Sequence, residues 1–274
     1  NSGFENKTRK FSLTSNYLES FTLNNEGNYI NIISRGKPFT MGNWSGPVYQ
    51  HGKLQGVRYK HIETLTDDNK VIVCTDEGNK ERLEVYNLNS KRLSKRLNVN
   101  IGRPISMKKS PTDDKIAIIN HKHELHLIDV NKDSIKKLDH SPFLPLSCNW
   151  SSDGNFIAYN CSKTPRVSII KIYDIKSNKK YEVTEGVSSD FSPFFDPSGN
   201  FLVFLSNRTF NPVYDSIQFD LNFTVSEKPY IIALNKKVNS PFIKSPIIDN
   251  KNNSTSKKKK DKIKKVRINF SGIK

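Results

Sequence analysis

The sequence predicts an all-β fold, a β-propeller, and three observations carry this prediction. A pattern of a strand, a short polar turn, a second strand and a third strand rich in Leu, Val and Ile recurs along the chain. Equivalent turn positions lie 46, 39 and 45 residues apart, from Asp68 to Asp114, from Asp114 to Asp153 and from Gly154 to Gly199. No helical period of useful length competes with this pattern. A repeat of about 40 to 45 residues with about four short strands is typical of a propeller blade.

Five copies of the pattern can be aligned, and each predicts its own strands. The first copy is partial, with a turn at 25–28 and a strand at 29–33. The strands expected in the other four copies are 57–65, 71–74 and 83–86; 104–109, 116–119 and 124–130; 148–150, 156–159 and 169–175; and 190–195, 201–206 and 229–234. One small sheet cannot bury both of its faces, whereas sheets stacked around an axis can. We expect about five visible blades of seven, and therefore an incomplete propeller.

Two regions interrupt the repeats. Residues 36–56 are rich in glycine and are expected to form a loop or an eroded blade edge. Residues 207–228 form a long insertion with several aromatic side chains, which we expect to pack over one end of the propeller. Trp44 and Trp150 are expected to be core or blade-packing residues.

Composition divides the chain into three parts. Residues 1–243 hold the predicted blades. Residues 244–265 are polar and rich in Lys and Asn, and we expect a disordered linker there, because like charges at this density repel each other and bury little apolar area. Residues 266–274 regain an alternating pattern, which we interpret as the truncated start of a following domain.

The net charge of +17 does not by itself indicate a nucleic-acid-binding protein. Nine Lys and Arg residues and one Asp lie between Lys251 and Arg267, so much of the excess belongs to one short segment. A surface for a duplex would gather basic residues on one element, with aromatic or base-reading side chains among them, and no such element is evident. We expect no nucleic-acid partner.

The sequence also indicates a protein of the cytoplasm that does not cross a membrane. It has no run of about 18 apolar residues. The first residues include neither an initiator Met nor an apolar signal region, which favours a fragment or a processed chain. The three cysteines, Cys74, Cys148 and Cys161, fit no disulfide or metal framework and are expected to be buried thiols.

The stretch from Asp190 to Asp220 resembles the propeller part of tricorn-type peptidases, which are large cytosolic serine proteases. The matching segments are DFSP from Asp190, FDP from Phe195, LSNR from Leu205, NPVYD from Asn211 and FD from Phe219. The Asp196–Gly199 turn alone is also common in TolB-type propellers. Weaker similarity extends from about Trp44 to Pro241. The resemblance implies a protease half beyond Lys274, and a homo-oligomer in the full-length protein.

No residue of this chain is predicted to be catalytic. There is no GxSxG motif, and no serine lies in a setting that indicates an activated nucleophile. His121 and His123 would share one face of a strand, but the next residues on that face are Leu125 and Leu127, which cannot bind a metal. We therefore predict no metal site and no cofactor, and expect a loop at a strand edge.

Arg58 and Arg103 are the candidate substrate contacts. Each precedes or begins the first strand of a predicted blade, and the first strands line the central channel of a propeller. Arginine is suited to bidentate binding of carboxylates, including a peptide C-terminus. The alternative is that both are solvated charges at the rim.

Three functional hypotheses follow. The resemblance implies a non-catalytic propeller that admits unfolded peptides to a protease chamber formed by the remaining domains of a parent peptidase. A standalone TolB-like propeller acting as a protein-binding scaffold is the alternative. The third hypothesis, a propeller from a prolyl-type oligopeptidase, would require a GxSxG motif outside this chain.

Overall fold

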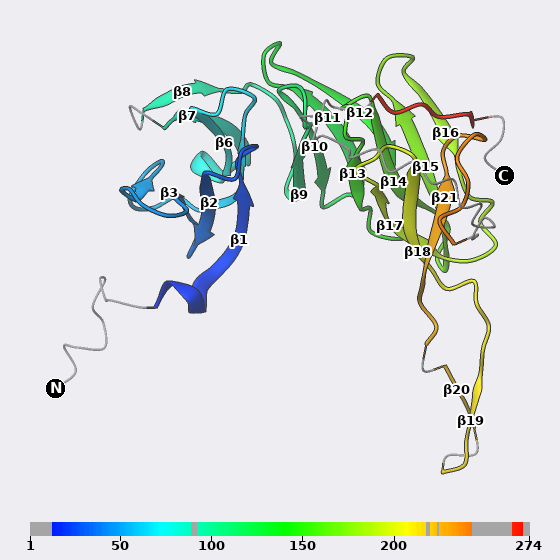
Figure 1. Ribbon diagram of the computed structural model, residues 1–274. Coiled ribbons are helices and arrows are strands. Elements are labelled where there is room, and N and C mark those ends of the chain that lie inside the picture. The colour runs from blue at the N-terminus through cyan, green and yellow to red at the C-terminus, as the bar shows by residue number, and fades with distance from the viewer. Residues whose placement is uncertain (1–12, 89–91, 218–219, 224, 243–264, 271–274) are drawn as a thin grey trace, which may run out of the picture. The chain divides into compact units, whose positions relative to one another are not determined.

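The computed structural model describes residues 13–88, 92–217, 220–223, 225–242 and 265–270, and its regular secondary structure consists almost entirely of strands (Figure 1). These residues form two compact units. Unit 1 comprises residues 1–103 with 132–134, and unit 2 comprises residues 104–131 and 135–274. Each unit is described by itself below.

Unit 1 contains two four-stranded antiparallel sheets, in each of which the strands are neighbours in chain order. The first sheet consists of β1 (Leu18–Leu23), β2 (Tyr29–Ser34), β3 (Lys37–Gly42) and β4 (Tyr49–Gln50). The second consists of β5 (Tyr59–Thr64), β6 (Lys70–Thr75), β7 (Arg82–Asn87) and β8 (Leu93–Arg96). Two short 3-10 turns accompany them, η2 (Thr14–Tyr17) and η3 (Glu77–Asn79).

Unit 2 contains three sheets of the same construction, with Ser134 alone assigned to unit 1. The third sheet consists of β9 (Pro104–Lys109), β10 (Lys115–Asn120), β11 (Glu124–Asp129) and β12 (Ser134–His140), and the fourth of β13 (Cys148–Trp150), β14 (Phe156–Thr164), β15 (Val167–Asp174) and β16 (Lys179–Glu182). The fifth has three strands among the described residues, β17 (Asp190–Phe195), β18 (Phe201–Ser206) and β21 (Lys228–Ala233). A separate hairpin is formed by β19 (Val213–Asp215) and β20 (Asp220–Asn222).

The strands predicted from the repeat are confirmed. β9, β13, β17 and β18 begin and end at the predicted residues, and the others differ by a few residues at their ends. Of the two alternatives for residues 36–56, a loop or an eroded blade edge, the loop is wrong, because β3 and β4 complete the first sheet within this region. Trp44 is 94% exposed, so the expectation of a core tryptophan is also wrong there. Trp150 is buried, and its Nε1 donates to the Lys108 carbonyl oxygen at 2.9 Å.

The middle strands are buried on both faces. In β6 and in β10, five consecutive residues are buried. Since successive side chains of a strand point to opposite faces, a sheet must be covered from both sides to show this pattern. Within unit 1, β5 packs against β1 and β2, and within unit 2, β17 packs against β13, β14 and β15. The first strand of each of these later sheets therefore covers the sheet before it.

The insertion does not pack as predicted. Its hairpin, β19 and β20, extends away from β18 and β21 (Figure 1). Phe210 is 76% exposed, and Tyr214 and Phe223 are exposed as well. The rings of Phe210 and Phe223 contact each other, with their centroids 5.3 Å apart. Among the described residues, this aromatic insertion therefore covers no end of a sheet.

Residues 265–270 join the core of unit 2. Val266 is buried in the cluster formed by the fourth and fifth sheets, beside the Asp196–Gly199 turn. Its amide donates to Asp153 Oδ2 at 2.9 Å, and the Asn269 amide donates to the Leu234 carbonyl oxygen at 2.9 Å. The ring of Phe270 stacks on Tyr181 at 3.5 Å. The domain limits stay predictions, but the described part of 266–274 belongs to the propeller core.

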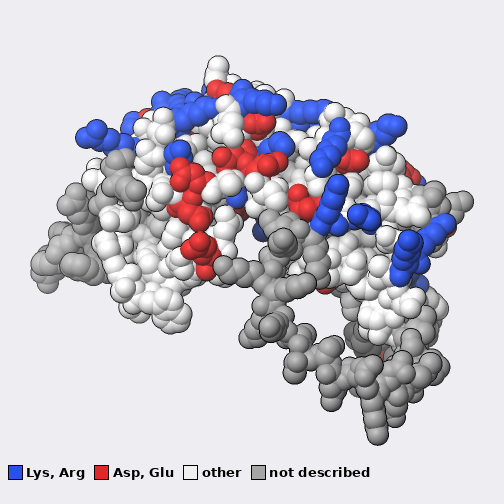
Figure 2. Space-filling model, turned by 45° about the horizontal axis from the view of Figure 1, so that its top comes forward, with Lys and Arg blue, Asp and Glu red and all other residues white. Residues whose placement is uncertain are grey.

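Charged side chains on the outermost strands are interspersed in sign. β12 carries Lys136 and Lys137, and β16 carries Lys179 and Lys180. Figure 2 shows blue Lys and Arg side chains beside red Asp and Glu side chains. Lys137 pairs with Glu124 at 2.6 Å, and Lys180 pairs with Asp139 at 3.2 Å. The lysines of these pairs are largely exposed, so the pairs keep the outer strands soluble.

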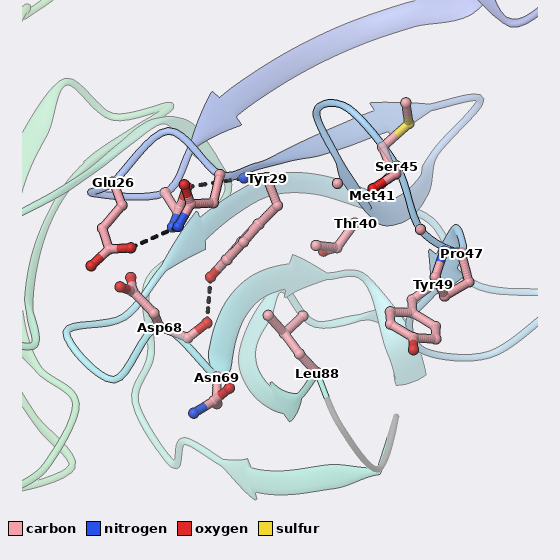
Figure 3. Close-up of a pocket in the computed structure, with 14 residues that line it drawn as sticks. Glu26, Tyr29, Thr40, Met41, Ser45, Pro47, Tyr49, Asp68, Asn69 and Leu88 are labelled. Carbon is pink, nitrogen blue, oxygen red and sulfur yellow. Dashed lines mark hydrogen bonds between the residues drawn. The ribbon is translucent and has the colours of Figure 1, made fainter.

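Hydrogen bonds join the first sheet to the second. The Tyr29 hydroxyl donates to the Asp68 carbonyl oxygen, as Figure 3 shows. Deeper in unit 1, the buried Asn31 side chain donates to Thr64 Oγ1 at 2.7 Å and accepts from Thr40 Oγ1 at 2.7 Å. Because these polar groups are buried, they fix the register of the two sheets as well as their contact.

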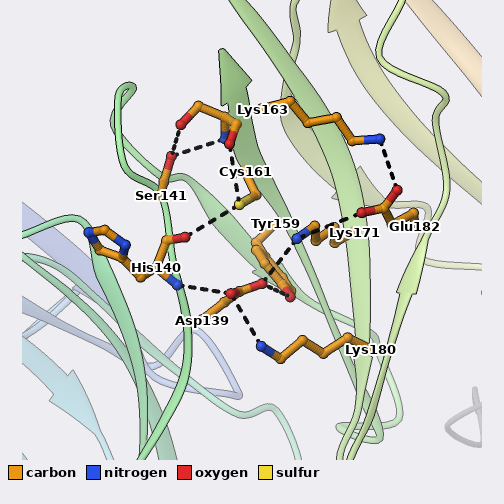
Figure 4. Close-up of polar contacts among 10 residues, drawn as sticks. Asp139, His140, Ser141, Tyr159, Cys161, Lys163, Lys171, Lys180 and Glu182 are labelled. Atoms are coloured by element: carbon orange, nitrogen blue, oxygen red, sulfur yellow. Dashed lines mark hydrogen bonds and ion pairs between the residues drawn. The ribbon is translucent and has the colours of Figure 1, made fainter. Parts of the chain in front are cut away.

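A partly buried carboxylate joins the third sheet to the fourth (Figure 4). Asp139 Oδ2 accepts from the Tyr159 hydroxyl at 2.8 Å and lies 3.4 Å from Lys171 Nζ. Burial disfavours the ionised Asp139, but the Tyr159 and His140 hydrogen bonds and Lys171 outweigh it and lower the pKa of this carboxyl. Asp139 is therefore ionised at neutral pH and holds β12 to β14 and β15.

Val266→Ala tests whether residues 265–270 belong to the core. Removing two buried methyl groups should lower the free energy of unfolding by about 2 kcal/mol. Arg267→Ala, at the exposed neighbouring position, should change it by less than about 0.5 kcal/mol. Urea denaturation followed by circular dichroism measures both, and equal effects would contradict the packing of Val266.

Asp139→Asn should show a pH-dependent loss of stability. The lowered pKa of Asp139 contributes stability that is fully present above its unfolded pKa, about 3.9, and is lost as the pH falls through the folded value. The variant should therefore be less stable than the parent by about 2 kcal/mol at pH 7, and the difference should shrink below about pH 4. Asp113→Asn, which removes an exposed pair with Lys115, is the control. A difference that persists unchanged at low pH would refute the role of the ionised carboxylate.

Candidate functional site

The first strand of every sheet is an edge strand. In each sheet the first strand has one neighbour, the second strand, so its other edge is not paired within the sheet. We call the end of a sheet at which its first strand begins the leading end. The two candidate residues from the sequence, Arg58 and Arg103, directly precede β5 and β9 and so lie at the leading ends of the second and third sheets.

Arg58 is an exposed side chain in a defined position. Its Nη2 lies 3.2 Å from Glu19 Oε2, and its stem lies against Gly36, which has a φ of 65° and no Cβ to obstruct it. Its amide donates to Asp76 Oδ1 at 2.9 Å. Arg103 is exposed and follows the buried Ile101. That either arginine contacts a substrate stays a prediction.

Asp190 occupies the comparable place in the fifth sheet, and there the charge is fully paired. Arg208 Nη2 donates to both carboxylate oxygens of Asp190, at 2.8 and 2.9 Å, and Arg208 Nε donates to Ser206 Oγ at 3.0 Å. The guanidinium lies over the rings of Phe204 and Tyr230. Because Asp190 is buried, this pair is a structural anchor for the start of β17 and for the insertion after β18.

Bulges occur near the leading ends of four first strands. The strand register shifts between Leu18 and Ser20, between Tyr59 and Ile62, and between Phe191 and Phe194, and also where Pro104 and Ser106 of β9 pair with β10. In β17 the bulge places Ser192 at a φ of 52°, a conformation that side chains rarely adopt. A bulge bends the strand and redirects its side chains.

Some first strands expose apolar side chains, although these strands also pack against neighbouring sheets. Ile105 of β9 is 55% exposed and Phe194 of β17 is 52% exposed, while Met107 of β9 and Phe195 of β17 are buried. Phe21 of β1 is exposed as well. The exposed face of the first strands therefore offers apolar contacts as well as charges.

Three hollows lie at ends of the sheets. One of about 310 Å3, between the first and second sheets of unit 1, is lined by Tyr29, Tyr49, Glu26 and Asp68 among others, and lies opposite the leading end (Figure 3). One of about 300 Å3 in unit 2 lies where β13 and β17 begin and is mostly apolar, with Leu144, Leu146 and Phe191. A third, of about 780 Å3, lies at the leading end of the second sheet. Sequence reasoning identified none of them.

The histidines and cysteines do not form a reactive centre among the described residues. His121 and His123 lie in the turn between β10 and β11, and nowhere in the described parts of the chain do three His, Cys, Asp or Glu side chains come together as metal ligands. Burial raises the pKa of the Cys74 thiol, which disfavours the reactive thiolate. No helix in the described ranges is long and apolar enough to cross a membrane.

Comparison with known proteins gives a consistent result. Residues 18–274 match the family model of the tricorn protease second beta propeller domain. A tricorn-like protease C-terminal subunit of Sulfurisphaera tokodaii is 36% identical over 218 residues, which cover 79% of this chain. The chain spans 25% of that relative's length.

Solved structures agree on the fold. The crystal structure of the tricorn protease superposes with a TM-score of 0.74 at 22% identity, and the match covers 84% of this chain and 23% of that chain. A structure described as TolB from Agrobacterium tumefaciens matches with a TM-score of 0.52 at 15% identity, over 79% of this chain and 77% of that chain. The predicted β-propeller is therefore confirmed, and the chain belongs to the tricorn protease family, in which it corresponds to the second β-propeller domain.

Proposed function

We propose that this propeller domain is a non-catalytic gate, which guides unfolded peptides to a protease chamber formed by other domains of the full-length protein. The observation that carries the proposal is the character of the first strands. Each is an edge strand, and β1, β9 and β17 expose an apolar side chain. An extended peptide can bind such an edge through its main chain and its side chains, whereas a folded protein cannot reach into a channel between fixed strands.

The proposal includes the partners and the place of action. The partners are unfolded peptides, the remaining domains of the parent peptidase and further copies of the full-length protein, which we infer to be a homo-oligomer in the cytoplasm. Arg58 and Arg103 are proposed to contact the peptides at the leading ends of β5 and β9. Both arginines are exposed, so a carboxylate can approach them.

One observation favours the scaffold alternative. The hairpin of β19 and β20 exposes Val213, Tyr214 and Leu221, and a two-stranded hairpin is at best marginally stable in water. A protein partner would cover this surface. The two functions differ in where a peptide binds, because the gate uses the first strands and the scaffold uses the hairpin.

Blocking a first strand should slow degradation of unfolded substrates. In the full-length protein, Ile105→Cys coupled to a bulky polymer maleimide should reduce the rate at which an unfolded protein is degraded, because the polymer fills the space in front of β9. The matched control is Ser134→Cys, which is coupled in the same way on the outermost strand β12. A second control is the parent protein treated with the reagent. Equal rates for the two coupled variants would contradict a gate at the first strands.

Arg58→Gln and Arg103→Gln should weaken binding of an unfolded peptide that has a free C-terminal carboxylate. Because exposed charge pairs are weak, we expect the Kd to rise about two- to fivefold for each variant, and to be unchanged for the same peptide with a C-terminal amide. Fluorescence anisotropy with the 274-residue chain measures both. Arg166→Gln, at an exposed turn between β14 and β15, is the control for loss of one charge. The substrate-contact hypothesis fails if that variant weakens binding as much.

A further inference from the structure

A hollow at the leading end of the second sheet is a pocket with several cationic side chains, which the sequence pattern did not indicate. It has a volume of about 780 Å3 and lies between the turn that leads into β7 and the segment that follows β8. Its lining residues are Asn79, Lys80, Glu81, Arg82, Arg96, Leu97, Asn98, Val99, Asn100 and Gly102. Three of these carry a positive charge and one a negative charge.

Three carboxylates in and beside this pocket are paired with cations, and a fourth, Asp133, accepts from the Asn98 amide at 3.0 Å. Glu81 pairs with Lys60, and Glu77 pairs with Lys53 and with Arg96 at 2.9 Å. Glu84, which is 1% exposed, accepts from Arg96 Nε at 2.8 Å and from the Tyr86 hydroxyl at 2.6 Å. These contacts hold Arg96 in place and leave its charge partly compensated.

Lys80 and Arg82 lack such partners. Within the described parts of the chain, neither side chain has a carboxylate within 4.0 Å or makes a hydrogen bond. Lys80 is exposed and Arg82 is partly buried. The pocket therefore presents Lys80 and Arg82, neither of which is in a close ion pair, beside Arg96, which is held by Glu77 and Glu84. The charge of Arg82 still acts on Glu77, because it helps to lower the pKa of that carboxyl.

The position of Arg82 depends on a glycine. Gly78 has a φ of 72°, and a Cβ at this residue would lie 2.9 Å from Arg82 Nη2. The guanidinium thus lies directly against the turn, where a larger residue would displace it. A methyl group at residue 78 would therefore change the position of the Arg82 guanidinium without a change of charge.

The pocket lies at the same end of the second sheet as Arg58. The Asp76 amide donates to the Arg58 carbonyl oxygen at 3.1 Å, and Asp76 directly precedes η3, which leads to Lys80 and Arg82. The pocket and the start of β5 therefore lie at the same end of one sheet, so a peptide bound at that end can extend from one to the other.

We propose that this pocket binds the carboxylate side chains of acidic segments in extended peptides. The proposal rests on the proposed function and names a substrate class for it. A guanidinium offers a carboxylate two parallel hydrogen bonds, and Lys80 adds a second charge. No aromatic side chain lines the pocket, so bases of a single-stranded nucleic acid would find no stacking partner, and an acidic polypeptide is the favoured ligand.

The test compares three labelled, C-terminally amidated peptides of Gly and Ser that carry regularly spaced Glu, Gln or Lys. Their binding to the 274-residue chain is measured by anisotropy at about 0.15 M salt, where attraction by distant charges is screened. The variants are Lys80→Gln with Arg82→Gln, and Gly78→Ala alone. The matched control is Lys122→Gln with Lys176→Gln, which removes the same charge from two exposed turns of unit 2.

We expect the Glu peptide to bind most tightly, and its Kd to rise about tenfold in the Lys80 and Arg82 variant. Gly78→Ala should also raise it, because Arg82 is displaced, and the control variant should leave it unchanged. Circular dichroism shows whether each variant is folded.

Other outcomes separate the two proposals. If the Glu and Gln peptides bind equally and all variants behave like the parent, the inference is wrong while the gate proposal stands. If no peptide binds, both fail. If a single-stranded oligothymidylate binds more tightly than the Glu peptide and depends on Lys80 and Arg82, the pocket binds a phosphate backbone, and the peptide assignment is overturned.

Discussion

The structure depends on one constraint, which is that a small twisted sheet cannot bury both of its faces alone. The middle strands β6 and β10 consist almost wholly of buried side chains, so each sheet needs a neighbour on either side. Within each unit, that neighbour is supplied by the first strand of the following sheet. The first strands thus serve the core with one face and are exposed on the other. This double role explains why β9 and β17 combine buried residues with exposed apolar ones such as Ile105 and Phe194.

Polar contacts determine how the sheets are placed against each other. Apolar contact alone would tolerate sliding of one sheet on the next, because hydrophobic burial is not directional. Asn31 in unit 1 and Asp139 in unit 2 each bridge two sheets, and each is satisfied by several partners. The Asp190 and Arg208 pair fixes the start of β17 against the end of β18 in the same way. Such groups are costly when one partner is missing, so they select a single register.

The sequence predicts those parts of the fold that depend on local periodicity. The first, second and third strands of most repeats combine apolar residues with a polar turn, and they were placed correctly. The outermost strands β8, β12 and β16 were not assigned, because they are largely exposed and rich in Lys, which resembles a loop. β3 and β4 were not predicted as strands, because this region is rich in glycine and proline. The contact of Val266 with Asp153 joins residues 113 positions apart, and no local pattern can indicate it.

The candidate site likewise contains residues that local periodicity predicts and residues that it does not. Arg58 and Arg103 follow from their position before a first strand, which the repeat supplies. The sequence did not indicate a site at Lys80 and Arg82. Their pocket depends on contact with residues 97–102, which follow β8, and on the absence of a side chain at Gly78. The local sequence shows only that Lys80 and Arg82 lie at a turn between two apolar strands. A charged residue in such a turn is usually solvated, so this pattern does not indicate a binding site.

Charge also differs between the two ends of the second sheet. Its leading end carries Arg58, Lys80 and Arg82, and the hollow at its other end is lined by the carboxylates of Glu26 and Asp68. Under our proposal for the pocket, an acidic segment is attracted at the first end, where the carboxylates are engaged by other partners, and repelled at the second, since like charges in a partly enclosed site are screened less than in open solvent. Under the proposed function, such a segment is captured at the leading end but is not retained further along the strand. A gate must combine both properties, because a peptide that binds tightly along its whole length would not move on.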